Sequence, residues 1–258
     1  MSGSRLCGAL VVVLAATFAR ASAGQTLIEH SAESRFQLDL LVPDVAVVGL
    51  LPEGWSLNVA SQGPAKDANL RIIFVDRLSI NRADGKPAGP TGSNRLVYLA
   101  VPVKEPGGAN VQLMIGGITE DPVDAPGPFG VYLPATTHTM RRATSSGSGP
   151  IIETQDWVFE AASGEHLEMH VTFERGVGNK GNPADVKFYS AKTPNVFQVS
   201  RQEQVLDILR NTTTAPPDRV RAFSLRASGG SYSKMFDGSE KVLSWDNILW
   251  VTRSVLSP

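Results

Sequence analysis

The chain has 258 residues, of which 42% are hydrophobic and 19% are charged. This composition is that of a globular protein long enough to bury one sizeable core. The formal net charge is −1 at pH 7 and the sequence pI is about 6.4, so no surplus of basic residues is available to neutralise phosphates. The charge balance therefore argues against nucleic acid as a partner.

Residues 1–23 have the pattern of a secretory signal peptide. Arg5 opens a short positive region, the apolar run "LCGALVVVLAATFA" follows it, and "ASA" at Ala21, Ser22 and Ala23 is a small-residue cleavage site. The apolar run is shorter than the roughly 20 residues that cross a bilayer. We therefore expect an exported protein, periplasmic or secreted, that starts at Gly24 and keeps no membrane anchor.

The only cysteine, Cys7, lies inside this leader. Residues 24–258 would then contain no thiol, which excludes disulfides, thiol nucleophiles and thiolate metal sites. No loop in this range is long enough to be an interdomain linker, so a single β-rich domain is the simplest organisation.

Most of residues 24–258 is predicted to be strand. Short alternating or continuously apolar segments are separated by Gly, Pro, Asn and Asp, as in β-dominated domains. In chain order the predicted strands are 35–42, 69–80, 95–104, 110–119, 130–134, 138–143, 151–161, 166–174, 185–191, 219–227 and 241–255. The pattern predicts a mainly β fold of the α+β kind.

Two segments have helical features. "VPDVAVVGLLPEGW" at 42–55 could form a short helical turn, although Gly49 and Pro52 weaken the pattern. In "SRQEQVLDILRN" at 200–211, Ser200 and Glu203 have the spacing of a capping box. Apolar residues follow at helical spacing, so we predict a helix that covers one side or end of the sheet.

The stretch "SGEHLEMHVTFERG" places His166, Glu168 and His170 at every second position. It is predicted to be the second strand of a hairpin, with these three side chains on one face and Leu167 and Met169 on the other. The two histidines would lie roughly 13 Å apart along a strand, which is too far for both to bind one ion. Only the pairs His166 with Glu168 or Glu168 with His170 could share a metal, so a solvated or cavity-facing polar strand is the preferred interpretation.

Two further motifs do not lead to a function. Gly176, Gly178 and Gly181 match a dinucleotide-binding spacing, but a proline and a strand follow instead of a helix, so we predict a hairpin loop. No serine occupies a G-x-S-x-G nucleophile elbow.

Large aromatic and basic side chains are candidates for ligand binding. The aromatic residues are either the lining of an apolar pocket or, as the simpler interpretation, part of the core. Adjacent arginines could hold a carboxylate or form an exposed strand edge. The residues concerned are Trp157, Trp245, Trp250, Phe236, Tyr132, Arg141 and Arg142.

Several segments taken together resemble the acetoacetate decarboxylase-like family. They are "LLPEGW", "ANLRIIFVDR", "RLVYLAVPVK" leading to "NVQLMIGGITEDP", the hairpin "DWVFEAASGEHLEMHVTFERG" and the ending "KMFDGSEKVLSWDNILWVTRSV". Their order spans roughly Arg35 to Val255. The resemblance implies a cone-shaped β-barrel with a hydrophobic cavity, surrounded by further strands and a few short helices.

The chemistry of that family depends on a lysine that this chain lacks at the matching place. The family decarboxylates 3-keto acids through a Schiff base on a lysine in a Tyr-Pro-Lys-Lys-type turn, whose pKa is lowered by a neighbouring cation. The corresponding segment here is "GPFGVYLPATTHTMRR", in which Ala135 and Thr136 follow Pro134. Nothing in the local sequence of Lys104, Lys180 or Lys187 marks a replacement.

The leading hypothesis is therefore an exported barrel that binds a small, mainly apolar or carboxylate ligand without the Schiff-base step. Tyr132, His138, Arg141 and Arg142 are the predicted ligand-binding residues, and no cofactor is predicted. One alternative is a decarboxylase-like carbon–carbon lyase acting on a 3-keto acid with a lysine from another strand. The others are a metal-dependent protein that uses Glu168 with His166 or His170, and a structural protein without a site. Assembly into a homo-oligomer is compatible with each.

Overall fold

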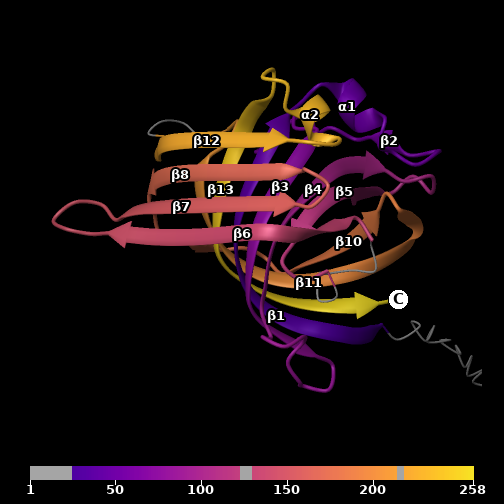
Figure 1. The fold of residues 1–258 in the computed structure, drawn as a ribbon, viewed down its shortest axis with the longest axis horizontal. Helices are drawn as coiled ribbons and strands as arrows, with labels where there is room; N and C mark the ends of the chain where they lie inside the picture. Colours follow the sequence, from indigo (N-terminus) through magenta and orange to yellow (C-terminus); the bar gives the residue numbers. More distant parts are fainter. Residues whose placement is uncertain (1–24, 123–129, 214–217) are drawn as a thin grey trace, which may run out of the picture.

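The computed structural model describes residues 25–122, 130–213 and 218–258, so the predicted leader with Cys7 lies outside the described residues. The described residues form thirteen strands and two short helices (Figure 1). In chain order these are β1 (Thr26–Leu41), α1 (Asp44–Val48), β2 (Ser56–Leu57), β3 (Leu70–Arg82), β4 (Asn94–Lys104), β5 (Asn110–Thr119), β6 (Tyr132–Ser145), β7 (Ile152–Ala161), β8 (His166–Glu174), β9 (Asn179–Lys180), β10 (Ala184–Ser190), β11 (Thr193–Arg210), β12 (Val220–Ser228), α2 (Tyr232–Met235) and β13 (Lys241–Ser257). The predicted β-dominated class is confirmed.

Seven of the strands close into a barrel. Their order is β5, β10, β11, β13, β1, β3 and β4, and pairing between β4 and β5 closes the ring. All these pairings are antiparallel except that of β10 with β5, where Phe188 lies opposite Gln112. Closure leaves no free edge along the paired parts of these strands.

The remaining long strands form a second layer outside the barrel. β6, β7, β8 and β12 pair antiparallel in that order, and β6 joins this layer to β5 through a short parallel contact at Tyr132. The four strands run across the direction of the barrel strands, and the β6–β7 hairpin projects beyond the barrel (Figure 1).

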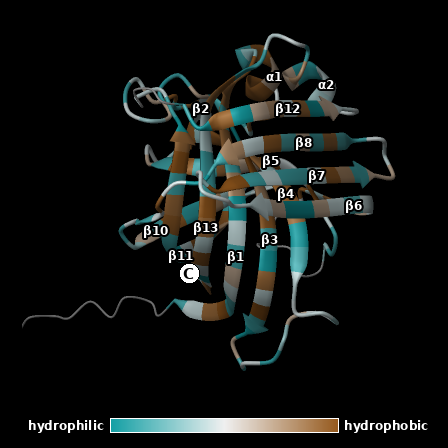
Figure 2. Ribbon diagram, turned by 90° about the vertical axis from the view of Figure 1, so that its left-hand side faces the viewer, coloured by the Kyte–Doolittle hydropathy of each residue, from teal (hydrophilic) through white to brown (hydrophobic). Residues whose placement is uncertain are grey.

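The barrel strands that pack against the second layer turn an apolar face toward it. Their other face points into the barrel and carries polar side chains such as Arg35 and Gln37. Along β1, Phe36, Leu38 and Leu40 belong to the large core that also contains Trp157 and Phe159 of the second layer. Hydrophobic and polar residues likewise alternate along β7 and β8 (Figure 2). The main hydrophobic core therefore lies between the barrel and the second layer.

The barrel interior holds a smaller apolar cluster. It comprises Ile73, Val75, Leu96, Tyr98, Ala100, Met114 and Val131, with Tyr132 and Phe188 packed against it. Because β3 and β4 contribute side chains to both cores, they are buried on both faces, which explains their nearly continuous apolar sequences.

The predicted helix at 200–211 is wrong, because residues 200–210 are part of β11. This strand pairs with β10 on one side and with β13 on the other, so its backbone donors and acceptors are used in two ladders. Tertiary pairing thus outweighs the local capping-box pattern. The predicted helical turn near residue 42 is confirmed as α1.

The segment with the three spaced glycines is not a hairpin loop, because β8 and β10 on either side of it do not pair with each other. Instead it contains β9, which pairs with β11. A Cβ atom at Gly178 would lie 2.6 Å from a side-chain carbon of Leu249. The glycine permits close packing rather than contact with a pyrophosphate.

In the part of the chain that the structure describes, neither helix approaches the length and apolarity that a membrane crossing requires.

Candidate functional site

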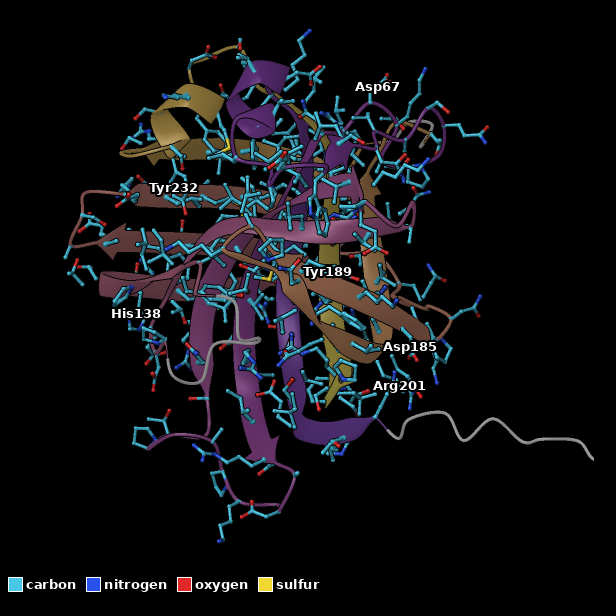
Figure 3. The ribbon with its side chains drawn as sticks, turned by 90° about the vertical axis from the view of Figure 1, so that its right-hand side faces the viewer. Asp67, His138, Asp185, Tyr189, Arg201 and Tyr232 are labelled. Carbon is cyan, nitrogen blue, oxygen red and sulfur yellow. The ribbon has the colours of Figure 1, made fainter. Side chains whose placement is uncertain are left out.

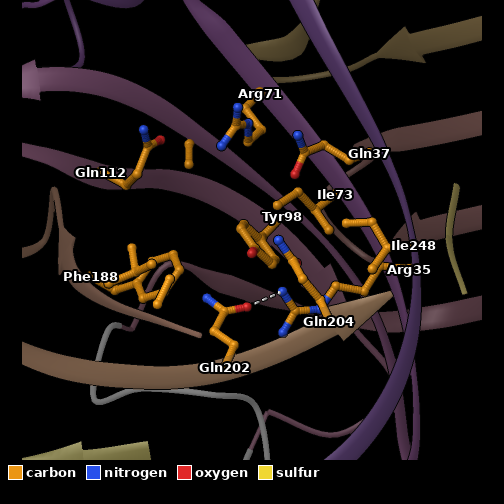
Figure 4. Close-up of a pocket in the computed structure, with 13 residues that line it drawn as sticks. Arg35, Gln37, Arg71, Ile73, Tyr98, Gln112, Phe188, Gln202, Gln204 and Ile248 are labelled. Carbon is orange, nitrogen blue, oxygen red and sulfur yellow. Dashed lines mark hydrogen bonds between the residues drawn. The ribbon is translucent and has the colours of Figure 1, made fainter. Parts of the chain in front are cut away.

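A polar cavity lies inside the barrel. Its volume is about 130 Å³, and all seven barrel strands contribute to its lining (Figure 4). The lining residues are Arg35, Gln37, Arg71, Ile73, Tyr98, Ala100, Gln112, Ala184, Val186, Phe188, Gln202, Gln204 and Ile248. Two arginines and four glutamines surround a space large enough for several water molecules or for a molecule of a few non-hydrogen atoms.

Arg35 is held rigidly in the cavity wall. Its Nε donates to Glu33 Oε2 at 2.8 Å and its Nη1 donates to Gln202 Oε1 at 3.0 Å (Figure 4). The side chain is 4% exposed. Since its hydrogen bonds span β1 and β11, Arg35 connects two walls of the cavity and fixes the orientation of the Gln202 amide.

Arg71 lies where this cavity adjoins a second cavity. Its Nε and Nη2 bond the two carboxylate oxygens of Asp39 at 2.6 and 3.1 Å. The adjoining cavity has a volume of about 280 Å³ and is also lined by Asn58 and Pro102. Gln112 lines both cavities, and its side-chain oxygen is buried without a hydrogen-bond partner. Arg71 and Gln112 therefore belong to the wall that the two cavities share.

Two carboxylates flank Arg71. Burial and, to a smaller extent, the Asp39 carboxylate raise the pKa of Asp246 to about 6, although Arg71 and a hydrogen bond from Ser244 oppose the rise. The Gln37 amide lies 3.4 Å from Asp246 Oδ2 and 3.5 Å from Asp39 Oδ2. Asp246, whose carboxyl group changes charge near pH 6, therefore contacts Gln37 of the cavity wall.

A network of ionised side chains fills the barrel beyond the cavity. Glu33 is fully buried and accepts hydrogen bonds from Ser31 and from Arg35. It also pairs with Arg77 Nε at 3.2 Å and with Arg253 Nη2 at 2.8 Å. Although burial opposes ionisation, these arginines hold the pKa of Glu33 well below its usual range. The network closes this part of the barrel with paired charges.

Of the ligand-binding residues predicted from the sequence, Tyr132 lines a small inner cavity next to the main one. The other three lie further along β6. His138 Nε2 lies 3.7 Å from Glu120 Oε1, and Arg142 pairs with Glu153 at 3.2 Å. Arg141 is exposed. None of these three is among the residues that line the described cavities, and His138 is seen on β6 outside the barrel (Figure 3).

The polar face of β8 turns away from the core. Leu167, Met169 and Val171 on the opposite face are almost completely buried. His166 lies 3.3 Å from Glu160 and 3.6 Å from Glu168, while His170 bonds Asp156. Within residues 25–122, 130–213 and 218–258, no group of three or more His, Cys, Asp or Glu side chains has the arrangement of a metal site.

Of the aromatic candidates, three are part of the hydrophobic core and one is exposed. Trp157 is fully buried and Trp245 is 6% exposed, and both belong to the core between the layers, as does Phe236 at its margin. Trp250 is 45% exposed. The simpler interpretation as core is thus confirmed for Trp157, Trp245 and Phe236.

Ala135 and Thr136, at the place of the family's lysine turn, lie within β6 rather than in a turn. Ala135 packs against the large core, and Thr136 donates to the carbonyl oxygen of Glu160. All eight lysines of the chain lie in described parts, and all are exposed. No amine therefore lines the barrel cavity among the residues that the structure describes.

The residues that line the cavity had a signal in the sequence that our prediction did not use. In "RFQLDL", Arg35, Gln37 and Asp39 alternate with three apolar residues. Alternation identifies two faces, and in a closed barrel the polar face can be the inner one.

Comparison with known proteins supports the fold. Neither a family model nor a curated protein matches the chain. The solved structure of the enduracididine biosynthesis enzyme MppR, complexed with the condensation product of pyruvate and imidazole 4-carboxaldehyde, matches with a TM-score of 0.55 and 11% identity, covering 90% of this chain and 87% of that chain. An acetoacetate decarboxylase-like enzyme from Sphingomonas wittichii RW1 matches with a TM-score of 0.52 and 11% identity, covering 90% and 91%.

At this identity the likeness concerns the fold alone. The described residues form a closed barrel of seven strands, further strands outside it and two short helices, which agrees with the resemblance seen in the sequence. The chain has the acetoacetate decarboxylase-like fold.

Proposed function

We propose that this protein binds a small carboxylate in the barrel cavity and does so without forming an imine. The observation that carries the proposal is the lining of the cavity, which combines two arginines and four glutamines with no lysine among the described residues. Such a lining can orient a charged or polar ligand through hydrogen bonds, but it offers no amine to attack a carbonyl group.

The position of Gln112 favours a polar ligand group at the wall that the two cavities share. Its unpaired side-chain oxygen is buried beside Arg71, and a buried polar atom without a partner costs free energy. A ligand that carries both a carboxylate and a hydroxyl or hydrated keto group could bond the Arg71 guanidinium and the Gln112 amide together. MppR, which shares the fold, is described with a pyruvate condensation product, and this ligand chemistry supports the same class here.

The positions of the lysines support the absence of Schiff-base chemistry. A lysine becomes a nucleophilic free amine at neutral pH when burial or a neighbouring cation lowers its pKa. The eight lysines of this chain are instead exposed. Lys187, for example, lies over the ring of Phe197 at 4.8 Å, on the surface of the barrel.

Isothermal titration with propionate, pyruvate and uncharged propanamide tests the proposal. We expect the two carboxylates to bind and propanamide to bind at least tenfold more weakly, since it lacks the charge. Arg71→Met should weaken binding of both carboxylates, and Gln112→Leu should weaken binding of pyruvate, whose hydrate supplies a hydroxyl donor, more than that of propionate. Arg201→Met is the matched control, because Arg201 pairs with Asp185 on the outer surface of β10 and β11 (Figure 3). Equal affinity of all three probes for the wild-type protein would contradict a carboxylate site.

Borohydride trapping separates binding from the alternative lyase activity. Incubation with pyruvate or acetoacetate followed by borohydride should leave the intact mass of the protein unchanged, because no imine forms. A permanent mass increment on one lysine would overturn the proposal and favour the 3-keto acid lyase.

We also propose that the protein is exported with cleavage after Ala23, as residues 1–23 suggest. Expression of residues 1–258 in a bacterium, followed by N-terminal sequencing of the extracytoplasmic fraction, should find Gly24 first. A chain that retains residues 1–23 in the membrane fraction would contradict this.

A further inference from the structure

A second, smaller cavity lies inside the barrel next to the main one. Its volume is about 20 Å³, and it shares Tyr98 and Phe188 with the main cavity. The full lining consists of Tyr98, Met114, Tyr132, Phe188, Gln198, Ser200, Arg253 and Val255. A space of this volume admits one occupant of about the size of a water molecule or a halide ion.

Three residues of this inner cavity carry a buried polar atom without a hydrogen-bond partner. These atoms are Arg253 Nε, Ser200 Oγ and Tyr132 Oη. Arg253 is 6% exposed and Ser200 is 3% exposed, so neither side chain can turn to bulk water. Three unpaired polar atoms at one small cavity are a costly arrangement for a protein interior, unless a bound species satisfies them.

All three atoms can act as donors. An arginine Nε–H can only donate, and serine and tyrosine hydroxyl groups donate readily. Burial raises the pKa of Tyr132 well above its usual value, so the hydroxyl keeps its proton. The lining of the cavity includes no carboxylate among the described residues. The acidic partners Glu29 and Glu33 bond Arg253 through Nη2, which leaves Nε as the donor that they do not use.

We propose that the inner cavity is a binding site for a monovalent anion of halide size, held by Arg253, Ser200 and Tyr132. An anion can accept all three hydrogen bonds at once, whereas a water molecule would have to donate to at least one of the two hydroxyl oxygens. Its charge also interacts favourably with the guanidinium in this low-dielectric interior. The strand β11 carries Ser200 two residues before Gln202, so the anion would lie about 7 Å along the strand from the glutamine of the main cavity.

Crystals grown in bromide test the site directly, because bromide scatters anomalously. We expect a single anomalous peak in the inner cavity, within hydrogen-bonding distance of Arg253 Nε, Ser200 Oγ and Tyr132 Oη. An inner cavity that holds only a water molecule at saturating bromide would overturn the proposal.

Solution measurements give an independent readout. Sodium chloride or bromide should raise the unfolding temperature of the wild-type protein relative to sodium methanesulfonate at equal ionic strength, since methanesulfonate is too large to enter and is not a carboxylate. Ser200→Ala and Tyr132→Phe each remove one donor and should raise the halide concentration for half of this effect about tenfold. Ser224→Ala, at an exposed position on β12, should change nothing.

An unchanged halide dependence in Ser200→Ala would overturn the proposal even if Tyr132→Phe did not fold. The result is distinguishable from the test of the proposed function, because the titrations with carboxylates are made in buffer that contains neither halide nor gluconate. The halide site could therefore be absent while carboxylates still bind the main cavity, and carboxylate binding could be absent while the halide still binds.

Discussion

Glu33 on β1 and Arg253 on β13 form an ion pair of 2.8 Å inside the barrel, and neither side chain is more than 6% exposed. Arg35 and Arg77 contact the same carboxylate. Glu33 therefore holds together cations from three neighbouring strands of the barrel wall. Removing it would leave buried guanidinium groups with fewer acceptors, which is far more costly than losing an ion pair at the surface.

We accordingly expect Glu33→Gln to lower the free energy of unfolding by about 3–5 kcal/mol. Urea unfolding followed by circular dichroism measures this. Glu203→Gln is the control, because Glu203 is 52% exposed and pairs with an exposed lysine. It should change stability by less than about 1 kcal/mol. Similar losses in the two variants would show that the buried network contributes no more than a surface pair.

The raised pKa of Asp246 predicts a stability that falls as the pH rises. The folded state holds the proton up to a pKa of about 6, whereas the unfolded state releases it near 3.8. Between these values the folded state binds more protons, so raising the pH through this window destabilises it by up to about 3 kcal/mol. Asp246→Asn should remove this loss. It should therefore match the wild type near pH 4 and exceed its stability near pH 7, whereas parallel stability curves would refute the assignment.

The same group should make ligand binding depend on pH. Above pH 6 the ionised Asp246 and Asp39 both lie near Arg71, and their negative charge opposes a carboxylate ligand. Wild-type affinity for propionate should therefore be higher at pH 5.5 than at pH 7.5, and Asp246→Asn should bind with similar affinity at both. A wild-type affinity that increases with pH would exclude this electrostatic coupling.

The fold class could be predicted from the sequence, but the polar cavity inside the barrel was not predicted. Apolar and polar residues alternate in "RFQLDL" and in "HLEMHVTF", yet the polar face of the first lines the barrel interior while that of the second faces outward. A period of two separates the faces of a strand without saying which is inside. Only the closure of seven strands, which depends on contacts distant in the sequence, decides between them.

The error at 200–211 has a related cause. Gln202 and Gln204 face the polar cavity, while Arg201 and Glu203 on the other face are exposed. With polar residues on both faces, this part of β11 shows no alternation. The capping-box spacing and the apolar residues that follow it favour a helix. The sequence pattern therefore does not identify Gln202 and Gln204 as residues of a cavity wall.

Close packing at Gly117 predicts a sensitive position on β5. A Cβ atom there would lie 2.7 Å from the carbonyl oxygen of Val97 and 2.8 Å from the ring of Tyr132. Gly117→Ala should therefore destabilise the protein by about 1–3 kcal/mol, because either the backbone of β4 or the tyrosine must move. Gly147→Ala is the matched control, since no atom lies within 4 Å of its added Cβ. Equal thermal unfolding temperatures for the two variants would contradict the packing.

The two faces of β8 predict opposite responses to truncation. Met169 is 1% exposed in the core between the layers, and Met169→Ala should cost about 2–5 kcal/mol. His170 is 41% exposed and bonds Asp156 at the surface, so His170→Ala should cost less than about 1 kcal/mol at pH 7. Denaturant unfolding of both variants, with zinc added in a parallel series, tests the polar face as well. If zinc stabilised the wild-type protein and His170→Ala abolished that effect, the face would be a metal site; equal curves with and without zinc are expected.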